Sequence, residues 1–410
     1  MRNCHRHLCI GATLCFGAVQ STAFEMKDAL LFSWDPVTIK PQLAITHTFN
    51  DNLFYREKAR QVSDLVTTLS PGVAILIGKR SDDYLTLRYT LNDYIYVDRT
   101  DLNTMEHSLE LESKIDGNWL SLHGMDRLQF LSSPTGTDIK ALDVQAGDTP
   151  VFIQEANIKR MSLYDNYTLT YKTGEKSQIY VSGLLSITDY EKDVRLLDFM
   201  TFVGTGGFGW IASQKSLLFG EAYYGVTTTS ANLPAPDYPG VTFVGGALGI
   251  RGKFTTKFGG VVRAGYETRK FDNGQSIPGS PVASVGITYD YSSKTSSSLN
   301  FVRRQDLSVY SGQQAYTANV VSLQASQKIG TAGKWRASAG GTLGMYDYDQ
   351  SGLNQKVSYE VASANFTLAY QPQLWLTAAL SYDLSSVIGG EGGITKYDVN
   401  RISLRVAVGY

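Results

Sequence analysis

The sequence has 410 residues, 43% of them hydrophobic, with 37 Lys and Arg residues against 38 Asp and Glu residues. This near-neutral balance lacks the basic excess of a nucleic-acid-binding protein, so we expect no nucleic acid as a partner. The 25 Tyr and 17 Phe residues favour β-structure, because aromatic side chains suit the half-buried surface of a sheet.

The first 23 residues have the pattern of a secretory signal peptide. Arg2 and Arg6 form a basic start, residues 8–19 form a short apolar core, and Ser21-Thr22-Ala23 supplies the small residues that a signal peptidase needs. We therefore expect a leader at 1–23, a short periplasmic segment at 24–39 and one domain at 40–410. The only cysteines, Cys4, Cys9 and Cys15, lie in the leader, so the exported chain would contain no disulfide.

Beyond the leader the sequence alternates between apolar and polar residues over many segments. From Tyr84 to Asn92, for example, Leu85, Leu87 and Tyr89 fall on one face while Arg88 falls on the other. This period of two predicts β-strands. The segments are 40–50, 64–78, 84–92, 103–115, 118–131, 157–172, 176–190, 196–211, 215–228, 242–252, 256–269, 281–291, 295–307, 315–328, 333–347, 357–370, 374–384 and 397–410, about eighteen in all.

Two classes of connection largely alternate along the chain. Short connections at 116–118, 173–175, 213–214, 292–293 and 371–373 carry turn residues, whereas long ones are rich in Gly, Pro, Asp and Ser. The long connections are expected at Asp51–Ser63, Ser132–Ala156, Ser230–Val241, Phe271–Ser280 and Ser386–Tyr397. The glycines of Gly204–Gly209 indicate either a hairpin or close strand packing. An up-and-down barrel with short periplasmic turns, longer external loops and both termini on the periplasmic side produces this alternation.

Strand length and the last strand favour a membrane barrel over a secreted β-sandwich or solenoid. The segments run to about ten to fourteen residues, which matches a tilted membrane crossing, whereas soluble strands usually have five or six. The last segment alternates to its aromatic end, with Ile402, Leu404, Val406, Val408 and Tyr410 on one face. This ending is similar to the signal that the outer-membrane barrel assembly machinery reads. The sequence thus predicts an all-β, transmembrane antiparallel up-and-down β-barrel of 16–18 strands in a Gram-negative outer membrane, surrounded by outer-membrane lipid.

If the apolar residues face lipid, a charged set faces the lumen. The candidate pore-lining residues are Arg88, Arg127, Arg160, Arg263, Arg336, Arg401, Arg405, Glu106, Glu110 and Glu267, with Glu112, His123 and Gln129 on the same face. Two interpretations remain open: the ordinary exclusion of charge from lipid, or an arginine-rich path for an anionic or hydroxyl-rich solute. Asp126 falls on the apolar face with Leu128, unless a local bulge or a place near the rim changes its direction.

Tyrosines near the strand ends suit the two aromatic girdles of a membrane barrel. The candidates are Tyr94, Tyr96, Tyr171, Tyr190, Tyr223, Tyr289, Tyr291 and Tyr370.

No pattern in the sequence indicates catalysis. Past the leader the histidines are His47, His107 and His123, which lack the spacing of a zinc site, and no G-x-S-x-G motif is present. We therefore expect no enzyme, no catalytic or metal-binding residues and no cofactor.

Residues 41–72 resemble the start of a known family. The strand opening at Pro41, the motif Asp51-Asn52-Leu53-Phe54, the pair Ser63-Asp64 and the triplet Ser70-Pro71-Gly72 are similar to type 2 β-barrel porins found with exopolysaccharide biosynthesis genes. Tyr89, Asn92-Asp93-Tyr94 and His107 extend the match over roughly the first hundred residues of the exported chain. By itself, Asp51-Asn52 is a pair that starts loops, since both side chains hydrogen-bond their own backbone.

The resemblance implies a pore that exports a secreted exopolysaccharide, with separate periplasmic polysaccharide-export proteins as partners. A general or solute-selective diffusion porin is the alternative.

Overall fold

The computed structural model of this chain describes residues 30–79, 83–135, 153–191, 197–213, 215–231, 240–272, 274, 276–307, 315–330, 333–349, 357–391 and 396–409. The predicted leader and Tyr410 lie outside these ranges, as do 136–152 of the predicted loop Ser132–Ala156. Within them the chain forms nineteen strands and two short 3-10 helices. Among the described residues, no helix is long and apolar enough to cross a membrane.

The strands, in chain order, are β1 (Phe32–Trp34), β2 (Val37–Asn50), β3 (Asp64–Gly78), β4 (Tyr84–Tyr96), β5 (Thr104–Asp116), β6 (Leu120–Thr135), β7 (Ile153–Lys172), β8 (Ser177–Tyr190), β9 (Leu197–Ser213), β10 (Ser216–Ala231), β11 (Val241–Lys253), β12 (Phe258–Phe271), β13 (Ser276–Asp290), β14 (Thr295–Leu307), β15 (Ala315–Ile329), β16 (Trp335–Asp349), β17 (Val357–Gln373), β18 (Leu376–Glu391) and β19 (Asp398–Gly409). The 3-10 helices are η1 (Lys58–Arg60) and η2 (Thr100–Leu102).

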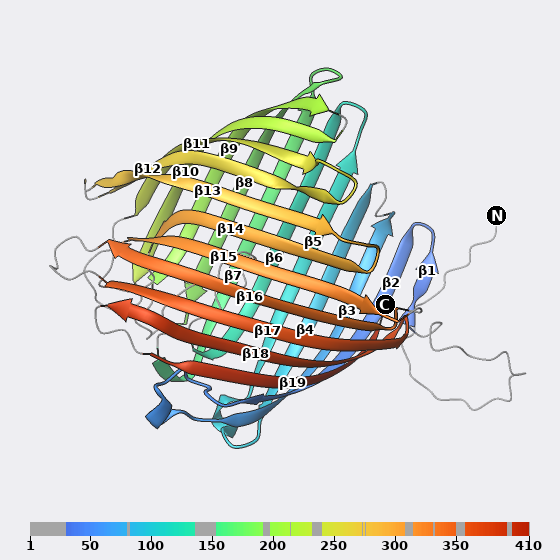
Figure 1. Ribbon diagram of the computed structural model, residues 1–410, viewed down its shortest axis with the longest axis vertical. Coiled ribbons are helices and arrows are strands. Elements are labelled where there is room, and N and C mark those ends of the chain that lie inside the picture. Colours follow the sequence, from blue (N-terminus) through green and yellow to red (C-terminus); the bar gives the residue numbers. More distant parts are fainter. Residues whose placement is uncertain are drawn as a thin grey trace, which may run out of the picture.

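The eighteen strands β2 to β19 form one closed antiparallel barrel (Figure 1). Each strand pairs with the next, and β19 pairs with β2 from Arg401↔Asn50 to Gly409↔Gln42. The short β1 pairs with the first residues of β2. The predicted fold class is confirmed, including the strand number. Because that number is even, the start of β2 and the end of β19 lie at the same end of the barrel, beside the short turns.

Large apolar side chains on the outside account for this architecture. Leu85, Leu87 and Tyr89 of β4 are 36–38% exposed, and Phe202 of β9 and Leu404 of β19 are about half exposed. Such a surface is unfavourable in water and favourable in hydrocarbon, and the closed sheet leaves no strand edge with unpaired backbone groups. The barrel is therefore built to span a membrane.

The expected girdle tyrosines divide into two groups. Tyr171, Tyr289, Tyr291 and Tyr370 lie outside at the short-turn end, where Tyr171 packs against Trp119 and Tyr370 against Trp335. For Tyr94, Tyr96, Tyr190 and Tyr223 the prediction is wrong, because they lie on the inward-facing side of their strands. The last three are at most 8% exposed.

Several strand ends were also predicted wrongly. β6 continues to Thr135 and β7 begins at Ile153, so the predicted loop Ser132–Ala156 is partly strand. Likewise β10 runs to Ala231, β13 begins at Ser276 and β18 reaches Glu391, inside segments expected to be loops. Beyond the hydrocarbon both faces of a strand can be polar, so the hydrogen-bonded ladder continues after the alternation of hydrophobicity has ended.

Gly204–Gly209 is not a hairpin, because it lies in the middle of β9. The Tyr180 ring lies across Gly207, where a Cβ would approach Tyr180 Cζ to 2.2 Å. Close strand packing, the other interpretation of this segment, is confirmed.

Asp126 faces outward without a bulge or a place at the rim. It stands opposite Asp165 in a continuous β6–β7 register, and the Tyr167 hydroxyl donates a hydrogen bond to it. The predicted register of β6 is therefore correct, and the carboxylate is a polar group on the lipid-facing side.

The connection between β2 and β3, residues 51–63, covers the junction of the first and last barrel strands; we call it the seam loop. Asp51 Oδ1 and Oδ2 accept hydrogen bonds from the backbone and side-chain nitrogens of Asn400, both at 2.7 Å. Asn52 is fully buried, and its Nδ2 donates to the carbonyls of Asp398 and Arg56 at 2.9 and 2.7 Å.

Apolar residues continue this packing under the seam loop. Leu53 and Phe54 are buried with Val66, Tyr96 and Leu102. The motif Asp51-Asn52-Leu53-Phe54 thus does more than begin a loop, since it connects the first barrel strand to the last.

We predict that Asn52→Ala destabilises the barrel, because it removes the buried amide that joins the seam loop to β19. The free energy of unfolding should fall by about 1–3 kcal/mol. The measurement is the temperature at which the compact, SDS-resistant form converts to the unfolded form on a gel. Lys58→Ala, at an exposed residue of the same loop, is the control. Equal transition temperatures for the two variants would show that the seam loop does not stabilise closure.

Candidate functional site

The inner wall carries arginine–carboxylate groups that span neighbouring strands. Arg88 of β4, Glu110 of β5 and Arg127 of β6 stand directly opposite one another in register. Arg88 Nη1 lies 2.5 Å from Glu110 Oε1, and Arg127 Nη2 lies 3.1 Å from Glu110 Oε2. One carboxylate is therefore shared by two guanidinium groups that are 19–38% exposed.

A second group lies across β8, β10 and β12. Arg263 Nε is 2.5 Å from Glu221 Oε1, and the Tyr180 hydroxyl donates to Glu221 Oε2 at 2.8 Å. Tyr180 reaches Glu221 across β9 because Gly207 has no side chain between them. The glycine-rich stretch of β9 is thus what makes room for an inward hydrogen-bonding group.

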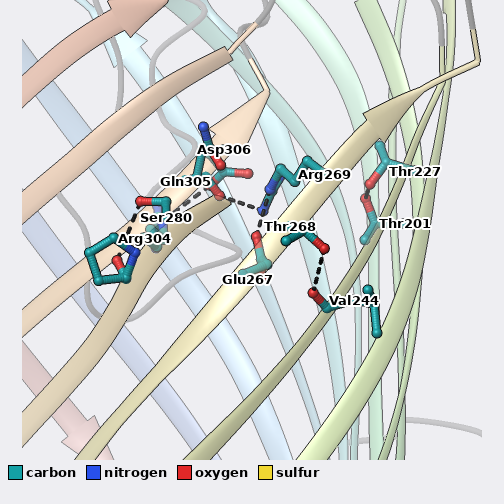
Figure 2. Close-up of polar contacts among 11 residues, drawn as sticks. Thr201, Thr227, Val244, Glu267, Thr268, Arg269, Ser280, Arg304, Gln305 and Asp306 are labelled. Carbon is teal, nitrogen blue, oxygen red and sulfur yellow. Dashed lines mark hydrogen bonds and ion pairs between the residues drawn. The ribbon is translucent and has the colours of Figure 1, made fainter. Parts of the chain in front are cut away.

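A third group lies further toward the long-loop end, between β12 and β14 (Figure 2). Arg269 Nε is 2.6 Å from Glu267 Oε1, and Arg269 Nη2 donates to the Gln305 carbonyl at 2.5 Å. Both ionised side chains are less than 10% exposed. On β14, Arg304 Nε lies 3.1 Å from Asp306 Oδ2, so this region too is compensated.

The third group, together with Arg263 of the second, lines a cavity of about 560 Å³ on the wall formed by β7 to β15. Its lining combines charged, hydroxyl and aromatic groups, which suits contact with a hydroxylated solute. The lining includes Tyr164, Thr201, Tyr223, Thr227, Arg263, Glu267, Arg269, Arg304, Asp306 and Tyr316. Thr201 and Thr227 lie on the same wall with their hydroxyls 2.9 Å apart (Figure 2).

All ten predicted pore-lining residues lie on the inward-facing side of their strands. In each case the neighbouring residues along the strand lie on the outside. Glu106 accepts hydrogen bonds from the Ser132 backbone and the Tyr94 hydroxyl, Arg160 is buried opposite Tyr190, and Arg401 contacts Tyr55 of the seam loop. Arg336 and Arg405 lie on β16 and β19, with Arg336 near the short turns. These residues are spread around the barrel and do not form one compact site.

Sequence reasoning missed four of the nine charged residues in these ion pairs. Glu221, Arg269, Arg304 and Asp306 were not among the candidates, although Glu221 and Arg269 alternate with outward residues as the named ones do. They add two arginines and two carboxylates to the named set, so arginines still outnumber carboxylates among the named residues of the wall.

The last strand has the expected alternation. Ile402, Leu404 and Val406 are 45–53% exposed on the outer face, and Val408 shares their parity. Recognition of this strand by the assembly machinery stays a prediction, and Tyr410 lies outside the described residues.

Comparison with known proteins finds similarity only among solved structures. No family model matches the sequence, and no curated protein matches it. The chain is similar to the solved outer membrane protein OpdK from Pseudomonas aeruginosa, with 8% identity and a TM-score of 0.45 over 91% of this chain and 99% of that one. It is also similar to P. aeruginosa OccK2 (OpdF) in complex with glucuronate, with 10% identity and a TM-score of 0.47 over 90% and 98%.

A bacterial polysaccharide outer membrane secretin also matches, with 6% identity and a TM-score of 0.35 over 90% of this chain and 98% of that one. Values this low carry no information about the solute. The resemblance of residues 41–72 to exopolysaccharide-associated barrels thus stays an expectation.

We predict that Glu110→Gln raises the preference of the pore for anions, because it leaves Arg88 and Arg127 without their shared counter-charge. The chloride-to-potassium permeability ratio should rise about two- to threefold at 0.1 M salt, where charges act over about 10 Å. Reversal potentials in planar bilayers measure this ratio. Asp126→Asn also removes one carboxylate, from the residue next to Arg127 but on the lipid face, and should leave the ratio unchanged. If the ratio changed with Asp126→Asn and not with Glu110→Gln, the inward and outward faces of β5 and β6 would be the reverse of those in this structure.

Proposed function

We propose that this chain is a pore of the Gram-negative outer membrane through which a secreted exopolysaccharide leaves the cell. The observation that carries the proposal is a closed eighteen-stranded barrel with an apolar outside and an inner wall of hydrogen-bonding groups. Barrels of this strand number leave an aqueous lumen. Such a lumen needs no catalytic residue, and the proposed role is passage without chemistry.

The character of the wall supports a saccharide as the solute. Many of its charges lie in ion pairs, and with their neighbours they offer a solute both hydrogen-bond donors and acceptors. Tyr164, Tyr180 and Tyr223 add inward aromatic rings with hydroxyl groups. Sugar rings present apolar faces and many hydroxyls, which match both kinds of group. The resemblance of residues 41–72 to barrels found with exopolysaccharide genes points the same way.

The proposal also names partners. The last strand would be read by the barrel assembly machinery, the apolar outside would contact outer-membrane lipid, and separate periplasmic polysaccharide-export proteins would deliver the polymer to the short-turn end. The alternative is a general or solute-selective diffusion porin, which the same polar wall supports.

Deletion of the gene separates these two functions. If the barrel exports polymer, we expect secreted exopolysaccharide to fall to background and polymer to accumulate in the periplasm, with both effects reversed by a plasmid copy. The measurement is sugar content in the medium and in the periplasmic fraction of the same cultures. Unchanged secretion would reject the export role and favour the diffusion porin.

A further inference from the structure

Basic residues gather at the short-turn end of β9 to β16. The described turn residues of this half of the rim, 213, 215–216, 252–258, 290–296, 327–330 and 333–336, contain seven basic side chains and one acidic side chain, Asp290. The basic residues, all exposed, are Lys215, Lys253, Lys257, Lys294, Lys328, Lys334 and Arg336. We call them the basic rim.

Backbone hydrogen bonds fix the basic rim from one turn to the next. The Lys253 N–H donates to the Lys215 carbonyl, and the Lys328 N–H donates to the Lys294 carbonyl, both at 2.8 Å. Lys257 Nζ donates to the Tyr291 carbonyl at 3.1 Å, and Lys294 Nζ to the Gly330 carbonyl at 3.0 Å. The ammonium groups are thus held beside the neighbouring turns by neutral acceptors, which leave their charge uncompensated.

A cavity of about 810 Å³ lies among these turns. Lys257, Lys294, Lys328 and Arg336 line it together with a single carboxylate, Asp290. In the part of the chain that the structure describes, none of these four cations has an ion-pair partner. The remaining lining is rich in hydroxyls, from Ser292, Ser293, Thr295, Ser296 and Ser326.

The cavity belongs to the mouth of the pore and not to the lipid face. Lys328 alternates with Ile329, and Arg336 alternates with Trp335; both apolar side chains are more than 40% exposed on the outside. Lys328 and Arg336 therefore point to the lumen side of the rim.

The other half of the short-turn end lacks this charge. The described turns from β3 to β8 carry Lys79, Lys114, Lys172 and Lys176 against Asp83, Asp116 and Glu175, and Lys114 pairs with Asp116 at 2.7 Å. The positive field is thus local to the turns between β9 and β16.

We propose that the basic rim is an anion-docking site at the entrance of the pore, which takes the carboxylate groups of an acidic saccharide. Unpaired cations at a pore mouth raise the local concentration of anions and their association rate, while the hydroxyls of the cavity can bond those of the sugar. This inference rests on the proposed pore and specifies its substrate class: a uronate-bearing chain captured at the short-turn end.

The test is blockade of single pores in planar bilayers by an oligogalacturonate, added to one chamber at a time, with maltohexaose as the neutral probe. For the wild-type protein we expect the acidic probe to block far more often from one side than from the other, and the neutral probe to show no such difference. Lys257→Gln/Lys294→Gln/Lys328→Gln should lower the blocking rate from the preferred side by about tenfold or more. In the unmutated protein, 1 M salt should have the same effect, since it shortens the range of the charges to about 3 Å.

Lys79→Gln/Lys172→Gln/Lys176→Gln removes the same number of charges from the same end, outside the basic rim, and is the matched control. Equal blocking rates for the two triple variants, or equal blockade from both sides, would overturn the docking site while leaving a conducting pore. The docking site would also be overturned if the basic-rim variant lost co-purified phospholipid phosphate while its blockade stayed unchanged. The lysines would then bind lipid headgroups and not the saccharide. Absence of conductance in a folded barrel would instead reject the proposed pore.

Discussion

Inside a bilayer no water can satisfy a bare backbone N–H or C=O group, so a sheet that spans it must close on itself. Here closure depends on the pairing of β19 with β2, chain segments that lie at opposite ends of the sequence. The seam loop reinforces that junction with the buried side chain of Asn52 and the paired bonds of Asp51 and Asn400. The even strand number puts the start of β2 and the end of β19 at the same end of the barrel, and the alternation of side chains along each strand gives the closed wall its two faces.

The same division determines the electrostatics of the lumen. Inward residues of neighbouring strands stand opposite one another, so Glu110 meets Arg88 on one side and Arg127 on the other. Ionised groups that would be costly in lipid become part of a compensated, hydrogen-bonding wall. At the short-turn end of β9 to β16 no such compensation occurs, and the basic rim adds a local positive field to an otherwise balanced pore.

The sequence predicted the features that a lipid environment requires, and it missed those that depend on which residues face each other across neighbouring strands. Alternation gave eighteen strands, because each crossing must present one apolar face to lipid. It could not place Tyr94 or Tyr223, since an aromatic residue suits a girdle and an inner wall equally well. Nor could it pair Glu221 with Arg263, because a single sequence does not reveal which residues face each other across strands. The bond between Asn52 and Asp398 joins positions 346 residues apart, so Asn52 could be read only as part of a loop.

The central claim is that successive residues of each strand alternate between a lipid-facing side and a water-filled side. Cysteine substitutions at two consecutive residues test it directly. The native cysteines all lie in the first fifteen residues, so variants lacking them give a clean background. Leu128→Cys and Gln129→Cys place a thiol on neighbouring residues of β6 with opposite parity. In intact outer membranes, a small membrane-impermeant thiol reagent should label Cys at 129 rapidly and Cys at 128 barely. Equal labelling of both, or faster labelling at 128, would contradict the barrel as a membrane pore with this inside and this outside.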